Sequence, residues 1–207
     1  MSGLGFTTIF SLKGGVGKTS LASALCLEFD YEGQKVPVIT NDVISPLEEI
    51  LGKDKALKLK PDQDFPELKK DDDIIVDLGG FVDERSISVL KNSKQVVIPT
   101  IGSFLSISGL IPTIQEVERF NKEITIVLNR IEKKEVAKVI QFIRERYDYP
   151  IFLLKTSKCF ENLLYQNKSV SQMMKDEPLR RSSYKEVHAQ LQEIIQHLQE
   201  YKNGHKP

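Results

Sequence analysis

Short runs of apolar, often β-branched residues alternate along this chain with longer stretches of helical periodicity. Six apolar runs predict strands, at Phe6–Leu12, Val36–Thr40, Ile74–Leu78, Gln95–Thr100, Glu123–Leu128 and Tyr149–Leu154. Most are continuous rather than alternating, which is typical of parallel strands covered on both faces. Helical patterns separate them, at Lys18–Asp30, Glu84–Asn92, Ile107–Asn121 and Lys133–Tyr147. This order predicts an α/β fold with a doubly wound, mostly parallel sheet and helices on both faces.

Two segments depart from this rhythm. Gly52 to Asp73 is rich in Lys, Asp and Pro, and we expect loops or short irregular elements there. The segment Ser182–Tyr201 has apolar residues at helical spacing and Gln, Glu and His between them, which predicts a helix packed on the sheet. Because no repeat or linker composition divides the chain, we expect residues 1–207 to form a single domain.

The composition supports a packed core. The 207 residues are 40% hydrophobic and 28% charged, which argues against disorder. The chain has 29 basic residues (Lys and Arg together) and 29 acidic residues (Asp and Glu together), and this balance disfavours a polybasic nucleic-acid protein. Cys26 and Cys159 have neither zinc nor disulfide spacing, and no secretory signal or membrane-spanning run is visible. A cytoplasmic location is therefore expected.

The most specific motif joins the first predicted strand to the first predicted helix. It reads Lys13-Gly14-Gly15-Val16-Gly17-Lys18-Thr19-Ser20, and the strict GxxxxGK[ST] pattern is not met because Leu12 holds its first position. Glycines let backbone N–H groups turn toward phosphate oxygens, and the helix start adds its own unpaired N–H groups. Lys18 can neutralise phosphate charge and Thr19 can ligate Mg²⁺. We predict a phosphate-binding loop formed by Gly14, Gly15, Val16, Gly17, Lys18, Thr19 and Ser20.

A carboxylate follows the third predicted strand. Asp77 ends the apolar run Ile74–Val76 and precedes Gly79 and Gly80. The carboxyl end of a parallel strand faces the crevice in which ligands bind. Asp77 is therefore predicted to hold Mg²⁺ through water, the alternative being an Asp that only caps the next turn.

With these motifs the chain resembles the ParA/MinD family of deviant Walker A (P-loop) ATPases. The resemblance implies ATP/ADP and Mg²⁺ as cofactors, and it implies that Lys13 reaches the partner's ATP in a nucleotide-sandwich dimer. Asp42 matches the second acid of the family's D-x-D pattern, so it would orient the attacking water and contact Mg²⁺. Thr40 stands where the first acid is usual. The catalytic residues implied are Lys13, Lys18 and Asp42, although an Asn-Asp pair after a strand is also ordinary turn chemistry.

The adenine contact is implied by a second match. Asn129 follows the apolar run Ile126–Leu128, at the place where the family has an Asn that binds the base. An amide can both donate to and accept from the edge of adenine. The alternative is an Asn that forms a turn.

Charge is unevenly distributed, with an acidic N-terminal half and a basic C-terminal half. A weak basic patch, doubled in a dimer, suits non-specific contact with DNA phosphates. The alternative is an ordinary solvated face. The candidates for DNA binding are Lys155, Lys158, Lys168, Arg180, Arg181 and Lys185.

These observations favour a short plasmid-partition ParA-like (ParF-type) ATPase. ATP would drive a homodimer or a higher assembly, and this form would bind DNA non-specifically on the nucleoid. A centromere-binding ParB/ParG-like partner would stimulate slow hydrolysis and reset it. The alternatives are a MinD-like membrane switch, a ParA-like protein with another cargo, and a metabolic enzyme that transfers the γ-phosphate. Stable membrane association is not expected, since the C-terminal helix lacks basic and aromatic membrane-binding character.

Overall fold

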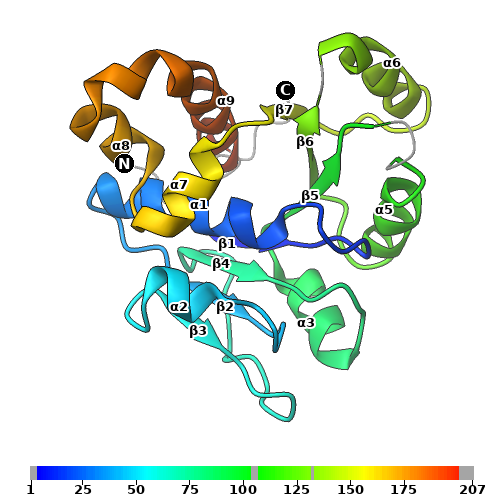
Figure 1. Cartoon of the computed structure of the whole chain (residues 1–207). Helices are drawn as coiled ribbons and strands as arrows, with labels where there is room; N and C mark the ends of the chain where they lie inside the picture. The colour runs from blue at the N-terminus through cyan, green and yellow to red at the C-terminus, as the bar shows by residue number, and fades with distance from the viewer. Residues whose placement is uncertain (1–3, 104–106, 132, 201–207) are drawn as a thin grey trace.

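The computed structural model describes residues 4–103, 107–131 and 133–200. Its core is one parallel sheet in the order β3-β2-β4-β1-β5-β6-β7 (Figure 1). The strands are β1 (Phe6–Ile9), β2 (Val38–Thr40), β3 (Ala56–Lys58), β4 (Ile74–Asp77), β5 (Gln95–Ile101), β6 (Ile124–Ile131) and β7 (Ile151–Lys155). The predicted α/β class with a parallel sheet is confirmed.

Alternate residues of each strand point to opposite faces, so the continuous apolar runs supply two separate cores. In β5, Val97 belongs to one core, while Val96 and Ile98 belong to the other. The first core is covered by α1 (Lys18–Tyr31), α2 (Leu47–Leu51), α7 (Cys159–Gln166), α8 (Val170–Asp176) and α9 (Arg181–Glu200). The second is covered by α3 (Glu84–Asn92), α5 (Leu110–Glu118) and α6 (Lys133–Arg144) (Figure 1).

The C-terminal helix behaves as its pattern predicts. Six residues of α9 are buried against the first core, namely Tyr184, Val187, Leu191, Ile194, Ile195 and Leu198. Tyr201, the last apolar residue of the predicted helix, lies outside the described residues. Within the described ranges, no helix has the length and apolar character needed to cross a membrane.

Several predicted boundaries were wrong. The segment Gly52–Asp73 contains β3, a three-residue strand that pairs with β2 at the edge of the sheet. The first strand ends at Ile9 rather than Leu12, because the chain turns there toward α1. The fifth predicted strand continues to Ile131, which places Asn129 inside β6 rather than after it.

Candidate functional site

The glycine-rich loop between β1 and α1 lies at the carboxyl edge of the central strands. Gly15 and Gly17 have φ angles of 74° and 97°, a left-handed conformation that glycine adopts without strain. A Cβ atom at Gly17 would collide with Nδ2 of Asn129. The path of the loop therefore depends on glycine at Gly17 for both its backbone conformation and its space.

The start of α1 leaves its backbone donors available. Gly17 is the N-cap and has no side chain to accept from the first turn, which contains no acidic residue. The unpaired N–H groups and the positive end of the helix dipole therefore face the loop. A site of this kind binds anions, and phosphate in particular.

Both lysines of the motif lie beside the loop entrance. The ammonium Nζ of Lys18 donates to the carbonyl oxygen of Ser11 at 3.5 Å. The backbone N–H of Lys13 donates to Oγ of Ser11 at 3.4 Å. Both lysines are half-buried, and the bond to Ser11 places the Lys18 ammonium group beside the residues that lead into the loop.

Asp77 lies directly below the first turn of α1. Its Oδ2 accepts a hydrogen bond of 2.8 Å from the Thr19 hydroxyl. Its Oδ1 is buried and has no hydrogen-bond partner among the residues that the structure describes. This bond joins Asp77 to α1. It differs from the alternative interpretation of Asp77, in which the side chain only caps the turn after β4.

The environment of Asp77 raises its pKa to about 6. Burial is the largest cause, because it penalises the charged carboxylate. The Thr19 hydrogen bond and the charge of Lys18 lower the pKa, whereas the charge of Asp42 raises it. A cation beside Oδ1 would favour the ionised form.

These residues fit a magnesium ion. Mg²⁺ prefers oxygen ligands and usually keeps several waters beside one or two protein oxygens and substrate phosphates. Thr19 offers a hydroxyl and Asp77 a carboxylate whose buried Oδ1 lacks a partner in the described part of the structure. In the described part of the chain no group of three or more His, Cys, Asp or Glu side chains could form a complete protein cage. An ion here would therefore share its ligands with water and phosphate.

Thr40 has a defined part in this region that the sequence did not reveal. Its fully buried hydroxyl donates to the backbone oxygen of Asp77 at 2.8 Å and accepts from the N–H of Asp42 at 3.1 Å. It therefore joins the ends of β2 and β4. An acid at this position would bury a second carboxylate beside Asp77.

Asp42 follows Thr40 at the same edge and is half-buried. Its Oδ1 accepts from the N–H of Ile44 at 3.1 Å, which is the turn contact named above as its alternative. Its charge nevertheless reaches Asp77, whose pKa it raises. The structure thus brings Asp42 near the predicted magnesium residues.

Asn129 is 8% exposed, and its Nδ2 donates to the backbone oxygen of Val16 at 2.9 Å. It is therefore held against the glycine-rich loop from within β6, and it does not form a turn. A hollow of about 490 Å³ opens beside it. Its lining includes Ser20, Asn129, Leu154, Ser157, Lys158 and Phe160.

The six predicted DNA-binding residues are dispersed over the C-terminal elements. Three of them form ion pairs within the chain: Lys155 with Glu186 at 2.7 Å, Lys168 with Asp176 at 2.7 Å, and Arg180 with Glu177 at 3.2 Å. The other three, Lys158, Arg181 and Lys185, are exposed. Half of the six are therefore already paired with acidic residues of the chain.

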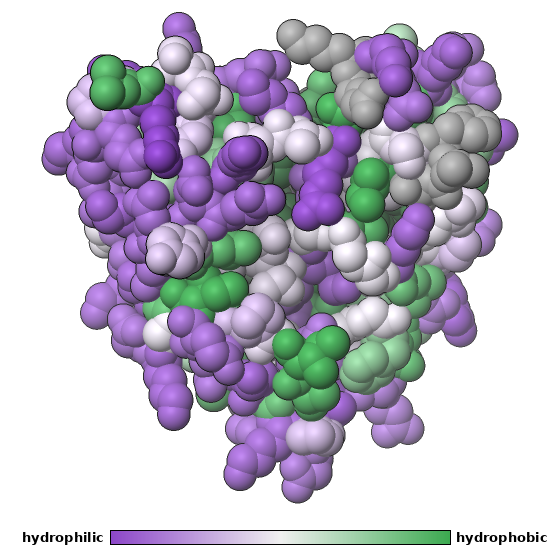
Figure 2. All heavy atoms as spheres, in the orientation of Figure 1, coloured by the Kyte–Doolittle hydropathy of each residue, from purple (hydrophilic) through white to green (hydrophobic). Residues whose placement is uncertain are grey.

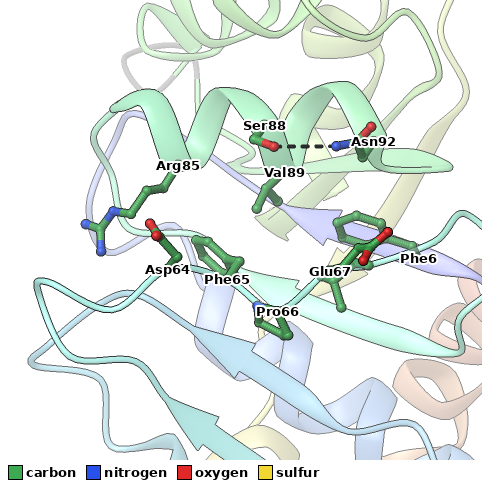
Figure 3. Close-up of a pocket in the computed structure, with 10 residues that line it drawn as sticks. Phe6, Asp64, Phe65, Pro66, Glu67, Arg85, Ser88, Val89 and Asn92 are labelled. Atoms are coloured by element: carbon green, nitrogen blue, oxygen red, sulfur yellow. Dashed lines mark hydrogen bonds between the residues drawn. The ribbon is translucent and has the colours of Figure 1, made fainter.

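A second cavity, of about 250 Å³, is lined by other residues. Figure 3 shows it between α3 and the segment Asp64–Leu68, with Phe65 and Pro66 opposite Val89. None of the predicted site residues lines it. The predicted phosphate-binding and magnesium residues thus lie around the glycine-rich loop and not at this cavity.

A parallel sheet with a glycine-rich loop between its central strand and a helix defines a P-loop NTPase-like α/β fold. The family model described as the CobQ/CobB/MinD/ParA nucleotide binding domain matches residues 7–178. The chain therefore belongs to this family, and the predicted ParA/MinD relationship is confirmed. Among curated proteins, none matches this sequence.

Solved structures show the same fold at low identity. The ATP complex of a Cyanothece McdA variant has a TM-score of 0.69 and 17% identity, over 100% of this chain and 99% of the other. A chain of the MinC:MinD cell division protein complex of Aquifex aeolicus has a TM-score of 0.64 and 17% identity, over 82% of this chain and 88% of the other. A plasmid partition protein from Borrelia burgdorferi gives 0.54 and 19%, over 77% and 96%.

Proposed function

We propose that this chain is an ATPase that binds ATP, and ADP after hydrolysis, at the loop of residues 13–20 together with Mg²⁺. One observation carries the proposal: buried Asp77 accepts a bond from Thr19 through one carboxylate oxygen, and the other oxygen has no partner among the described residues, beside the uncapped start of α1. A P-loop ATPase needs this combination of anion-binding backbone and metal-binding oxygens.

In this proposal the residues of the loop divide the work. The backbone N–H groups of residues 14–20 bind the phosphates, and Lys18 neutralises β- and γ-phosphate charge. Thr19 and Asp77 hold Mg²⁺, which when bound would offset further phosphate charge. Asp42 orients the attacking water and contacts the ion's water shell. Asn129 binds adenine in the adjoining hollow.

We further propose that two copies meet at the carboxyl edge of the sheet. Four exposed apolar residues follow β1, β2 and β4 there, namely Leu12, Val43, Ile44 and Phe81. Figure 2 shows that the face in view is largely hydrophilic, with hydrophobic side chains in separate groups. A symmetric dimer would cover these four residues and would bring Lys13 of each copy to the other's nucleotide, where a cation stabilises the transferring phosphate.

The cargo proposed is DNA, as in plasmid segregation. The support is the excess of basic residues in the C-terminal half, of which Arg181 and Lys185 are exposed on α9. Two such surfaces in one dimer would bind the nucleoid non-specifically through phosphate contacts. A centromere-binding ParB/ParG-like partner would stimulate hydrolysis and so release the dimer.

The test is retention on DNA with ATP, ADP or no nucleotide, over a series of salt concentrations, beside a parallel series with anionic lipid vesicles. We expect retention on DNA only with ATP, and we expect it to fall steeply as the salt concentration rises. It should be lost in Lys18→Ala and kept in the matched control Lys122→Ala. Retention on vesicles alone would favour a MinD-like membrane switch instead. Absence of ATP-dependent retention on either would contradict a positioning ATPase.

A further inference from the structure

Asn41 lies buried between the ends of two neighbouring strands, β2 and β4. It is 4% exposed, and its Oδ1 accepts a hydrogen bond of 2.8 Å from the backbone N–H of Gly79. The last paired residues of these strands are Thr40 and Asp77. The Asn41 side chain therefore continues the pairing of the two strands beyond the point at which their backbone ladder ends.

The segment that Asn41 holds passes against the phosphate-binding loop. A Cβ at Gly80 would lie 3.3 Å from the backbone oxygen of Leu12 and 3.6 Å from that of Ser11. A Cβ at Gly79 would lie 2.9 Å from the ring of Phe81. The backbone of residues 79–80 is thus confined on one side by Asn41 and on the other by the entrance to the loop.

The amide of Asn41 has unused capacity. Its Nδ2 is buried and has no hydrogen-bond partner within the described ranges. Native structures rarely keep such a donor unpaired without a use for it. An acceptor that approaches from the segment after β4 would satisfy it.

We propose that Asn41 is a positioning residue for the segment after β4. Its Oδ1 fixes Gly79, which sets the distance of residues 79–80 from the phosphate-binding loop. Its Nδ2 takes an acceptor from the same segment when that segment closes on nucleotide. The second step rests on the proposed ATPase function, whereas the first holds for the free protein.

Three variants separate these steps. Asn41→Ala removes acceptor and donor, while Asn41→Asp keeps an acceptor for Gly79 and removes the donor. The matched control is Asn121→Ala, because the Asn121 amide donates to the backbone oxygens of Leu90 and Ser93 at 2.9 and 2.8 Å, away from the loop. It reports what the loss of comparable hydrogen bonds does to stability alone.

The measurement is amide hydrogen exchange of residues 78–82 with and without a non-hydrolysable ATP analogue, together with kcat and KM for ATP. In the free protein we expect exchange about tenfold faster in Asn41→Ala, the size of effect that one hydrogen bond supplies. The increase should be smaller in Asn41→Asp, which keeps the acceptor for Gly79 but adds a charge to a buried position. The analogue should slow exchange in the wild type and not in Asn41→Asp. In Asn41→Ala, kcat should fall about tenfold while KM changes less than about threefold.

The proposal would be overturned if, in the free protein, the amides of residues 78–82 exchanged no faster in Asn41→Ala than in Asn121→Ala. An equal fall of kcat in Asn121→Ala would also overturn it, because the effect would then be one of general stability. A wild type that neither binds nor hydrolyses ATP would refute the proposed function. The exchange of the free variants would still decide whether Asn41 holds Gly79.

Discussion

Thr19 donates a 2.8 Å hydrogen bond to Asp77, and this contact joins the first turn of α1 to the end of β4, 58 residues away in sequence. The bond orients one carboxylate oxygen and leaves the other buried and unpaired within the described structure. Because α1 directly follows β1 in the sequence and β4 pairs with β1 in the sheet, the two residues meet only after β1 and β4 have paired. Binding of an ion at this place therefore reports on the folded topology.

The first prediction concerns that hydroxyl. Thr19→Val keeps the side-chain volume but removes the hydrogen bond to Asp77 and one oxygen ligand. We expect ATP affinity in Mg²⁺ to fall at least about tenfold, while affinity in EDTA changes little. Calorimetric titration of ATP measures both, and Thr19→Ser should retain the wild-type affinity. An equal loss in EDTA would mean that Thr19 acts on the nucleotide without the ion.

The second prediction follows from the raised pKa of Asp77, about 6 against a usual 3.8. Between these values the folded protein binds more protons than the unfolded chain, so this group lowers stability as pH rises from 4 toward 6. In metal-free protein the total effect is at most about 3 kcal/mol. The variant Asp77→Asn has no titratable group at this position, so it serves as the reference.

Urea denaturation of wild type and Asp77→Asn from pH 4 to 7.5 in EDTA measures that effect. The free energy of unfolding of the wild type, relative to the variant, should decline as pH rises through about 5 and should level off above about 7. A difference that is independent of pH would show that Asp77 is ionised throughout this range.

The third prediction concerns Thr40, where the family pattern has an acid. Thr40→Val removes a buried hydroxyl that pairs with Asp77 and Asp42 backbone groups, at a cost of about 1–3 kcal/mol in unfolding free energy. Thr40→Asp should destabilise the nucleotide-free protein further, because it buries a carboxylate beside Asp77. Urea denaturation measures both changes, with Thr40→Ser as the control that keeps the hydroxyl. Wild-type stability in Thr40→Asp would contradict this account.

The fourth prediction concerns Asn129. Asn129→Ala removes the bond to Val16 as well as the proposed base contact, so we expect ATP to bind about tenfold more weakly. The ratio of ATP affinity to GTP affinity should also fall, and a competition titration measures this ratio. A loss of affinity with unchanged base preference would confine Asn129 to holding the loop.

The fifth prediction separates the basic candidates by their surroundings. Lys155 and Lys168 already have acidic neighbours within the chain, whereas Arg181 and Lys185 are exposed on α9. The double change of Arg181 and Lys185 to Ala should reduce the salt dependence of ATP-driven DNA binding more than the double change of Lys155 and Lys168. Equal effects would contradict this division.

Apolar periodicity was sufficient to predict the central strands, because continuous β-branched runs such as that of β5 are buried on both faces. It failed at β3, whose three residues have no apolar run and are held by pairing with β2 at the sheet edge. The short helices α7 and α8 were also missed, since seven or eight residues give too few turns for a periodic signal.

The candidate site also contains features that the sequence predicts and contacts that only the fold reveals. The loop of residues 13–20 is contiguous, so its residue types alone indicated where phosphate would bind. The contacts of Thr40 and Asn41 cross from β2 to β4, and they depend on a strand order that no local pattern records. Asn129 was selected by its position after an apolar run, whereas its bond to Val16 became visible only in the folded structure.

The loop that leads into α1 is proposed to bind ATP, with Mg²⁺ held by Thr19 and Asp77. One calorimetric comparison tests this central claim most directly. ATP is titrated into wild type and Asp77→Asn, each in Mg²⁺ and in EDTA. The account predicts that Mg²⁺ strengthens ATP binding at least about tenfold in the wild type and has little effect in Asp77→Asn. An equal gain from Mg²⁺ in both proteins, or no ATP binding by the wild type, would contradict it.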